Sequence, residues 1–252
     1  MRDPKASSRE FPPLNAPRIV AIPIAFNEEL KIGSVLDRFA EVEGVDVAVL
    51  DDGSTDRTPE IIVQKGAMLI QHSQRGGAGA AIRTAYRWAA ERDYDICVIM
   101  AGNDKDRPAE IFRLIDPIAK GQAVLVQGSR YLPGGNYGNM PFYRRLSTQF
   151  IHPLLFSTFA RRRMTDTTNG YRAVRLDVLN DARINLDQVW LDKYELEPYL
   201  LYTLIRLGYP VSEVPVTKIY PLRELGYTKM KPITGWWSIL RPILLLGFGL
   251  KK

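Results

Sequence analysis

The sequence is poor in the residues that build disulfide frameworks and histidine-based metal sites. Its 252 residues include one cysteine, Cys97, and two histidines, His72 and His152. One cysteine cannot form an internal disulfide and two histidines cannot make a histidine cluster, which excludes disulfide-rich secreted folds, zinc fingers and most zinc hydrolases. Cys97 lies in an apolar run and is expected to be a small buried hydrophobe. We expect a reducing compartment, the cytoplasm.

Long apolar runs are also missing. No segment supplies the roughly 18–20 apolar residues that cross a bilayer, because the densest stretch, ILRPILLLGFGL, is interrupted by Arg241 and Pro242. The first residues, MRDPKASSREFPPLNAP, have no apolar centre and do not predict a secretory signal. We expect residues 1–17 to be a flexible lead and the chain not to span a membrane.

Positive charge exceeds negative charge. The formal net charge is +6 and the isoelectric point is about 9.4, which favours anionic partners such as nucleic acid, phosphorylated metabolites or acidic lipids. Because no segment interleaves aromatic and basic residues as nucleic-acid platforms do, we expect no nucleic-acid partner. Hydrophobic residues make up 46% of the chain, enough to bury the core of one compact domain.

From residue 18 onward, short β-rich runs alternate with helical patterns, which is typical of an α/β protein with a mostly parallel sheet and helices on both faces. The predicted strands are mostly apolar, as strands covered on both faces should be, and they span residues 18–24, 45–51, 67–71, 96–100 and 123–128. The predicted helices span residues 28–39, 59–65, 77–92 and 108–120. After residue 128 the alternation stops. The next predicted helix is interrupted near Pro153, and the later segment YPVSEVPVTKIYP predicts a strand limited by its prolines.

Polar residues gather directly after the five predicted strands. These clusters read AFNEE, LDDGSTDRT, SQRGGAGA, AGNDKDRP and GSRY. Ligands of an open α/β sheet bind beyond the carboxyl ends of the strands, so we expect these segments to form one site. Any one cluster could serve only as a helix cap or a turn, but five together favour a functional edge.

Asp51 and Asp52 end the second predicted strand, where two adjacent carboxylates repel each other. They need hydrogen-bond donors, which the base and ribose of a nucleoside can provide. Asp56 or Thr55, a few residues later, serves equally well as the cap of the helix that follows.

The motifs AFNEE, VAVLDDGSTDRT, RGGAGAAIRT, QGSRYLPGG and TDTTNGYRAVR, in this order and spacing, resemble the family 2 glycosyltransferases, in particular the dolichyl-phosphate mannosyltransferase-like subgroup. The resemblance covers about residues 18–231. It implies a glycosyltransferase A fold, a Rossmann-like sheet that takes a nucleotide sugar as donor. By this match the base and ribose pocket is lined by Ala25, Asn27, Glu28, Asp51 and Asp52. Gly79 would let a helix N-terminus approach the donor, and a tight turn without a ligand is the alternative.

The segment after the fourth predicted strand departs from the family pattern. The family's Asp-x-Asp positions hold Ala101 and Asn103. The leaving diphosphate gains negative charge that a metal ion or fixed cations must neutralise. Asp104 or Asp106, with Asn103 as a weaker ligand, can hold Mg²⁺ or Mn²⁺. Alternatively, the diphosphate contacts two cations directly, Lys105 and Arg107.

The acceptor side follows the fifth predicted strand. The resemblance implies that an acceptor phosphate is gripped by two arginines with a hydroxyl nearby, from among Arg130, Arg144, Arg145, Ser147 and Thr148. A lipid phosphate is already an anionic nucleophile, whereas a hydroxyl acceptor needs a general base. The candidate bases are Asp166, Glu195 and Glu197. We expect the catalytic residues to be Asp104, Asp166 and Arg130.

Two distal segments complete the prediction. Arg223 and Lys229, in YPLRELGYTKM, match a family loop that closes over the donor diphosphate and excludes water. Residues 232–252 combine paired Trp, an aliphatic stretch and terminal Lys, which predicts an amphipathic segment that either touches a membrane surface or packs on the sheet. The catalytic domain would span residues 18–231.

We therefore predict an inverting glycosyltransferase that moves a sugar from a nucleotide-sugar donor to an acceptor. A polyprenyl phosphate is the first choice of acceptor, with peripheral contact to the cytoplasmic face of a membrane. A soluble sugar or metabolite hydroxyl is the alternative acceptor. A nucleotide-sugar-binding protein without catalysis is the alternative from another class, motivated by Ala101 and Asn103.

Overall fold

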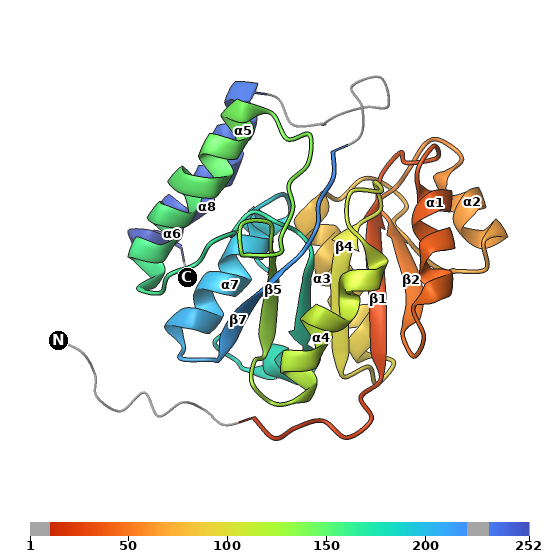
Figure 1. Cartoon of the computed structure of the whole chain (residues 1–252), viewed down its shortest axis with the longest axis horizontal. Coiled ribbons are helices and arrows are strands. Elements are labelled where there is room, and N and C mark those ends of the chain that lie inside the picture. Colours follow the sequence, from red (N-terminus) through yellow and green to blue (C-terminus); the bar gives the residue numbers. More distant parts are fainter. Residues whose placement is uncertain (1–10, 221–231, 252) are drawn as a thin grey trace.

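Seven β-strands form one mostly parallel sheet at the centre of the protein (Figure 1). The computed structural model describes residues 11–220 and 232–251. The strands are β1 (Ile19–Ala25), β2 (Asp46–Asp51), β3 (Met68–Gln71), β4 (Ile96–Ala101), β5 (Leu125–Ser129), β6 (Arg172–Arg175) and β7 (Val211–Pro215). Their order is β3-β2-β1-β4-β6-β5-β7, and β6 runs antiparallel to both of its neighbours. The five predicted strands, the later Pro-limited strand, which is β7, and the α/β class are confirmed; β6 was not predicted.

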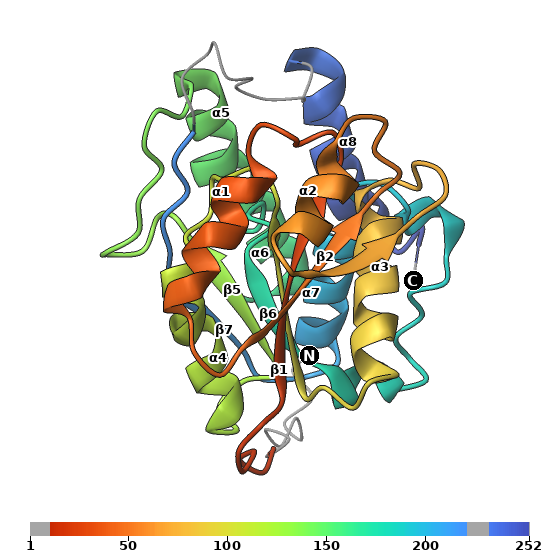
Figure 2. The same ribbon diagram turned by 90° about the vertical axis from the view of Figure 1, so that its right-hand side faces the viewer.

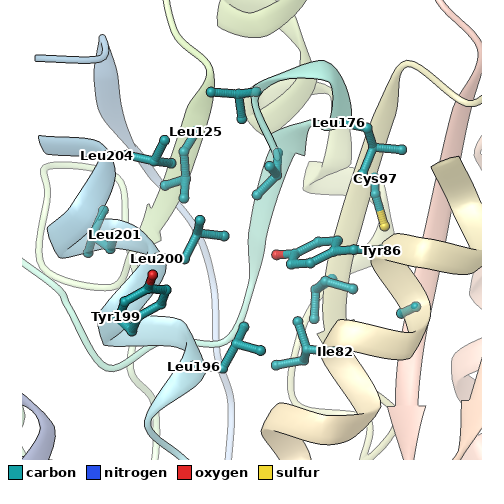
Figure 3. Close-up of a cluster of buried hydrophobic side chains, with 14 of the residues drawn as sticks. Ile82, Tyr86, Cys97, Leu125, Leu176, Leu196, Tyr199, Leu200, Leu201 and Leu204 are labelled. Atoms are coloured by element: carbon teal, nitrogen blue, oxygen red, sulfur yellow. The ribbon is translucent and has the colours of Figure 1, made fainter. Parts of the chain in front are cut away.

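Helices cover both faces of the sheet (Figures 1 and 2). One apolar cluster lies between the sheet and the helices α1 (Ile32–Asp37), α2 (Thr58–Gln64) and α4 (Ile111–Ala119). A second cluster fills the other face, under α3 (Ala78–Ala90), α6 (His152–Ala160), α7 (Leu196–Arg206) and α8 (Pro232–Gly247). Figure 3 shows part of it, where Ile82 and Tyr86 of α3 face Leu196 and Leu200 of α7. Because both faces are covered, the strands are apolar throughout.

Two helices differ from their predicted extent. The helix expected over residues 28–39 is the shorter α1, followed by a 3₁₀ segment, Arg38–Glu41. Residues 29–31 form a turn instead, in which the N–H of Lys31 donates to the carbonyl of Glu28 (2.9 Å). The interruption expected near Pro153 is a π-helical segment, Ser147–Ile151, between α5 (Phe142–Leu146) and α6. Pro153 sits in the first turn of α6, and the wider π turn accommodates its missing N–H.

The C-terminal amphipathic segment forms α8, which packs against α6 and α7 (Figure 1). Ile243 and Leu246 of α8 are buried, and Phe159 packs edge-on against Phe248 with ring centroids 5.3 Å apart. One face of the segment therefore packs on the protein, while Trp237 is 60% exposed. Within the two described ranges, no helix is both long and apolar enough to cross a bilayer.

Residues 11–17, placed by the sequence in a flexible lead, run against the lower edge of the sheet in Figure 1. Leu14 donates its N–H to the carbonyl of Ala119 (2.9 Å), and the Arg175 side chain donates to the carbonyl of Pro12 (2.8 Å). Phe11 packs on Tyr209, with ring centroids 5.7 Å apart. This part of the expected lead is thus bound to the domain; residues 1–10 lie outside the described part of the chain.

Candidate active site

The loops after β1 and β2 are bound to each other by residues of the predicted donor pocket. Asn27 Oδ1 accepts a hydrogen bond from the N–H of Thr55 (2.9 Å), and the N–H of Asn27 donates to Ser54 Oγ (2.8 Å). The N–H of Glu28 donates to Thr58 Oγ1 (2.8 Å). The structure therefore brings the motifs AFNEE and DDGSTD together, as their positions at neighbouring strand ends predict.

Asp51 obtains its hydrogen-bond donors from the protein. Its buried carboxylate accepts from the N–H of Ser54 (3.2 Å), from the Ser54 hydroxyl and from the Gln71 side chain (3.3 Å). The N–H of Asp52 donates to the carbonyl of Ala25 (2.9 Å), so both ends of the Asp pair are fixed. The sequence argument assigned the donors to a nucleoside, whereas the structure supplies them internally.

Asp52 holds the Gly-rich turn before α3. Its two carboxylate oxygens accept hydrogen bonds from the N–H groups of Gly76 (2.8 Å) and Gly77 (2.9 Å). His72 Nδ1 lies 2.9 Å from the same carboxylate, and its Nε2 lies 2.9 Å from Thr84 Oγ1. Asp52 thus joins the end of β2 to the Gly-rich segment and sets the position of the turn.

Gly79 is needed where two stretches of backbone meet. A Cβ at Gly79 would lie 1.8 Å from the carbonyl oxygen of Leu191, and one at Gly77 would lie 2.5 Å from that of Asp192. The N–H of Gly79 donates to the carbonyl of Lys193 (2.6 Å), so the chain itself takes up a donor of this helix N-terminus. Gly79 therefore serves close packing, a different use from the predicted approach to a donor. A cavity of about 370 Å³ opens beside this contact, over Gly76 and Gly77.

The loop after β4 pairs both of its carboxylates with cations of the protein. Asp104 has a positive φ of 62° and forms an ion pair with Arg38, with Oδ2 3.1 Å from Nη2. Asp106 is buried; its Oδ1 lies 2.6 Å from Lys218 Nζ, and its Oδ2 accepts the N–H of Ala101 (3.0 Å). The structure thus gives Asp104 and Asp106 partners other than the expected metal ion.

The Asn103 side chain carries an oxygen atom that could bind a metal ion in this loop. Its Oδ1 is buried and receives no hydrogen bond from the described residues. Across residues 11–220 and 232–251, no three His, Cys, Asp or Glu side chains come together as a metal site. Divalent hard cations prefer carboxylates but also bind through substrate phosphates and water. Asn103 Oδ1 therefore fits a cation that takes most of its ligands from a bound diphosphate, and it does not make a site alone.

Lys105 is the buried cation of the same loop. It is 7% exposed, and its Nζ lies 4.8 Å from the ring centroid of Tyr220. Burial, together with the nearby charges of Lys218, Arg144 and Lys31, lowers the pKa of Lys105 to about 7. Lys105 follows Asn103 by two residues, and with this lowered pKa it is only partly protonated near neutral pH.

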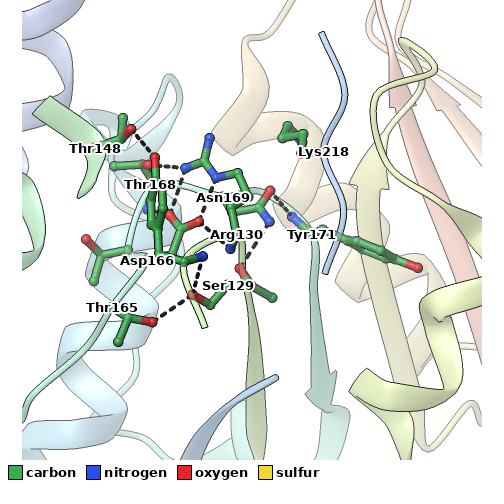
Figure 4. A network of polar contacts seen from close by, with 12 residues as sticks. Ser129, Arg130, Thr148, Thr165, Asp166, Thr168, Asn169, Tyr171 and Lys218 are labelled. Carbon is green, nitrogen blue, oxygen red and sulfur yellow. Dashed lines mark hydrogen bonds and ion pairs between the residues drawn. The ribbon is translucent and has the colours of Figure 1, made fainter. Parts of the chain in front are cut away.

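Arg130 and Asp166 form a buried ion pair at the end of β5 (Figure 4). Arg130 Nε donates to Asp166 Oδ2 (2.6 Å), and Nη2 donates to Oδ1 (2.7 Å) and to Thr168 Oγ1 (2.7 Å). Burial alone would raise the pKa of Asp166, but Arg130 and its hydrogen bonds lower it below the usual range. The geometry argues against a general base at Asp166, because both oxygens are held by a cation. It also argues against Arg130 as a direct phosphate ligand.

The second predicted arginine, Arg144, lines a different cavity of about 150 Å³. Thr148, from the π-helical segment, and Glu197, from α7, line the same cavity. Glu197 is paired with Arg172, 3.1 Å away. The other predicted base, Glu195, is buried with Oε1 3.3 Å from an Arg241 nitrogen. The structure thus brings the acceptor-side arginine, hydroxyl and one candidate base to one cavity.

The sequence analysis did not identify some residues of the site, and some of the residues that it did predict lie outside the described part of the chain. Lys218 and Tyr220, which contact Asp106 and Lys105, come from a Pro-limited segment that we read only as a strand. The sequence did contain a pattern that could have identified them, because a lysine and a tyrosine two residues apart follow a predicted strand. Arg223 and Lys229, predicted to close over the donor, lie outside the described residues.

Comparison with known proteins identifies the family. Residues 20–181 match the family described as Glycosyl transferase family 2. The chain belongs to glycosyl transferase family 2. It is 34% identical over 224 residues to a dolichyl-phosphate hexose transferase of Haloferax volcanii, covering 87% of this chain and 89% of that protein. It is 32% identical over 219 residues to an undecaprenyl-phosphate mannosyltransferase of Micrococcus luteus, covering 84% of this chain and 87% of that protein.

The fold of this family 2 protein is shared with solved structures. Glucosyl-3-phosphoglycerate synthase of Mycobacterium tuberculosis, crystallised with Mn²⁺, UDP-glucose and phosphoglyceric acid, superimposes with a TM-score of 0.66 at 24% identity, covering 92% of this chain and 80% of that chain. The predicted glycosyltransferase A fold and a nucleotide-sugar-dependent glycosyltransferase are thereby confirmed. The role of each site residue remains a prediction.

Proposed function

We propose that this glycosyltransferase transfers a sugar, with inversion, from a nucleotide-sugar donor to a polyprenyl phosphate. The observation that carries the proposal is the cavity at which Arg144 and Thr148 meet, which shares Tyr194 with the cavity over Gly76 and Gly77. A guanidinium group and a hydroxyl together suit a phosphate. The names of the relatives from Haloferax volcanii and Micrococcus luteus support the same class of acceptor.

The geometry supports attack without a general base. A phosphate oxygen of the acceptor is anionic, so it can attack the anomeric carbon directly while the bond to the donor diphosphate breaks on the opposite face. Arg144 would hold that phosphate, and Arg130, bound to Asp166, would act as a positioning residue through Tyr220 (3.3 Å). Asp166 is then a structural partner of Arg130.

The donor diphosphate needs positive charge as it leaves. Mg²⁺ or Mn²⁺ is the proposed metal cofactor, held by Asn103 Oδ1 together with diphosphate oxygens and water. A bound cation of this kind would neutralise the diphosphate. The Mn²⁺ in the structural neighbour's complex supports this assignment.

Transfer can be tested with radiolabelled GDP-mannose and UDP-glucose. The acceptors are undecaprenyl phosphate, undecaprenol and 3-phosphoglycerate, with extraction of the lipid product into butanol. We expect label in the lipid phase only with the phosphate-bearing lipid. Arg144→Met should raise the KM for that lipid by about tenfold or more, because a charge-assisted contact is lost. Label only in phosphoglycerate would contradict the proposal, and the absence of transfer with any donor would favour a binding protein.

A soluble hydroxyl acceptor is the second candidate. Glu197 and Tyr194 line the same cavity as Arg144, so a carboxylate lies where a base for a hydroxyl would be needed. The phosphoglyceric acid in the neighbour's complex is an acceptor-sized anion of this kind. Glu197→Gln separates the two candidates: it should abolish transfer to a hydroxyl and leave transfer to a lipid phosphate largely intact.

We further propose that α5 and α6 contact a membrane surface. An apolar stripe on these helices, 44–78% exposed, consists of Phe142, Leu146, Phe150 and Leu154. Arg145 stands on α5 and is half-buried, and a cation beside an apolar stripe suits a surface of anionic lipid. Large exposed apolar patches are uncommon on proteins that stay in water.

Sedimentation with phosphatidylglycerol vesicles tests this contact. Phe142→Ser/Phe150→Ser should reduce binding strongly, because each change removes apolar area from the interface. Val63→Ser is the matched control, since Val63 is 60% exposed on α2. If the double variant bound vesicles as well as the wild type, the apolar stripe would not be the membrane contact.

A further inference from the structure

Tyr194 lines two cavities of the site. The cavity of about 370 Å³ over Gly76 and Gly77 has Tyr194 in its wall. The cavity of about 150 Å³ that contains Arg144 and Thr148 has Tyr194 in its wall as well. Because Tyr194 is 40% exposed, its side chain is accessible to a ligand in these cavities. The two cavities therefore meet at one aromatic side chain.

The larger cavity adjoins the motifs of the predicted donor pocket. Asp52 binds the N–H groups of Gly76 and Gly77, which line this cavity. Arg75 lines it too, and its Cζ lies 4.2 Å from the ring centroid of Phe26 in the motif AFNEE. The wall thus contains residues that contact the loops after β1 and β2. In the proposed function the larger cavity is on the donor side and the smaller cavity is on the acceptor side.

The backbone on both sides of Tyr194 is held by neighbouring helices. The carbonyl of Asp192 accepts a hydrogen bond from the N–H of Ala80 in α3 (3.0 Å). On the other side, Glu195 is buried, and its carbonyl accepts a hydrogen bond from the N–H of Tyr199 in α7 (3.0 Å). The packing of α3 and α7 therefore sets the position of Tyr194 at the junction of the two cavities.

The transferred sugar has to lie between the donor diphosphate and the acceptor. Its anomeric carbon is bonded to a diphosphate oxygen, and the acceptor oxygen approaches the same carbon from the opposite side. A side chain that lines both cavities is placed to touch this sugar. One face of an aromatic ring packs on the C–H groups of a pyranose, and the tyrosine hydroxyl can form a hydrogen bond with a sugar hydroxyl.

We propose that Tyr194 contacts the pyranose ring of the donor sugar and contributes to the recognition of that sugar. This inference rests on the proposed function. As the bond between the anomeric carbon and the diphosphate oxygen breaks, its electron pair stays on that oxygen, and the acceptor oxygen supplies the electron pair of the new bond. Tyr194 exchanges no proton in this step. Its role is to hold the sugar ring at the junction of the two cavities.

Titration calorimetry in Mn²⁺ tests this contact with GDP-mannose and UDP-glucose, and with GDP and UDP, which lack the transferred sugar. Tyr194→Leu should weaken the binding of the sugar nucleotide that the wild type binds by about threefold to tenfold, because the aromatic face is lost. Binding of the corresponding diphosphate should stay unchanged. Tyr194→Phe keeps the ring and should retain most of the affinity. Phe112→Leu, the control on α4, alters an aromatic residue of similar exposure (43%) and should leave both affinities unchanged.

The failure of this inference and that of the proposed function can be told apart. Sugar-nucleotide binding by Tyr194→Leu equal to that of the wild type would overturn the role of Tyr194 alone. Equal weakening of sugar-nucleotide and diphosphate binding would also overturn it, because Tyr194 would then shape the donor pocket without contacting the sugar. No binding of any of the four nucleotides by the wild type would contradict the proposed function itself. If Tyr194→Leu does not fold, Tyr194→Ser also lacks the ring, and the same outcomes apply to it.

Discussion

Breaking the Arg130–Asp166 pair should destabilise the fold more than it alters any single ligand contact. Both side chains are buried, at 1% and 0% exposure, and they share two hydrogen bonds of 2.6 and 2.7 Å. Arg130→Met leaves the Asp166 carboxylate in the interior without its counterion. Removing one partner of a buried ion pair costs about 3–5 kcal/mol, because the remaining charge is neither solvated nor matched.

The size of the effect follows from this burial. For a chain of this length, 1 kcal/mol moves the midpoint of thermal unfolding by roughly 2–4 °C, so Arg130→Met and Asp166→Asn should each lower it by roughly 6–20 °C. Arg130→Met/Asp166→Asn removes both charges. It should lose at least about 2 kcal/mol less than the sum of the two single losses, because neither partner is then left alone.

Urea unfolding of the four proteins, followed by circular dichroism, measures these differences. Lys120→Met, in an exposed pair with Asp116, is the control and should leave the urea midpoint unchanged. The argument would be refuted if each single variant had a free energy of unfolding within about 1 kcal/mol of the wild type and the loss in the double variant equalled the sum of the two single losses. Arg130 would then be free to serve as the phosphate ligand that the sequence suggested.

Three further outcomes follow from packing and burial. Gly79→Ala should lower the free energy of unfolding, measured in denaturant, by roughly 1–3 kcal/mol, because its Cβ would lie 1.8 Å from the carbonyl oxygen of Leu191. Gly33→Ala, the control in another helix, should leave that free energy unchanged or raise it by up to about 1 kcal/mol. Equal effects of the two changes would contradict the close backbone approach at Gly79. Burial lowers the pKa of His152 to about 4. As the pH falls from about 6.5 towards 4, only the unfolded chain takes up a proton at this histidine, so the free energy of unfolding should fall by about 3 kcal/mol. The urea midpoint of His152→Gln should decline less over the same pH range than that of the wild type. Burial raises the pKa of Cys97, so a thiol reagent should label the native protein only as fast as it opens, and rapid labelling would disprove that burial.

The strands and the functional edge were predictable from local patterns. Strands covered on both faces are apolar along their whole length, so β1 and β4 stand out against polar surroundings. Polar clusters after those strands meet at one edge because parallel strands share a direction. The short strand β6 escaped, since it has four residues, two of them arginine, and runs against its neighbours.

The sequence by itself determined the α/β class, the family and the edge of the sheet that carries the site, because these depend on patterns within single segments. Only the tertiary structure decided what each charged residue does. Asp104 is bound to Arg38, 66 residues away, and Asp166 to Arg130, 36 residues away. Such partners are set by the order of strands and the packing of loops, which no local pattern encodes. A carboxylate that looks like a metal ligand or a base in the sequence can therefore be the counterion of a distant arginine in the fold.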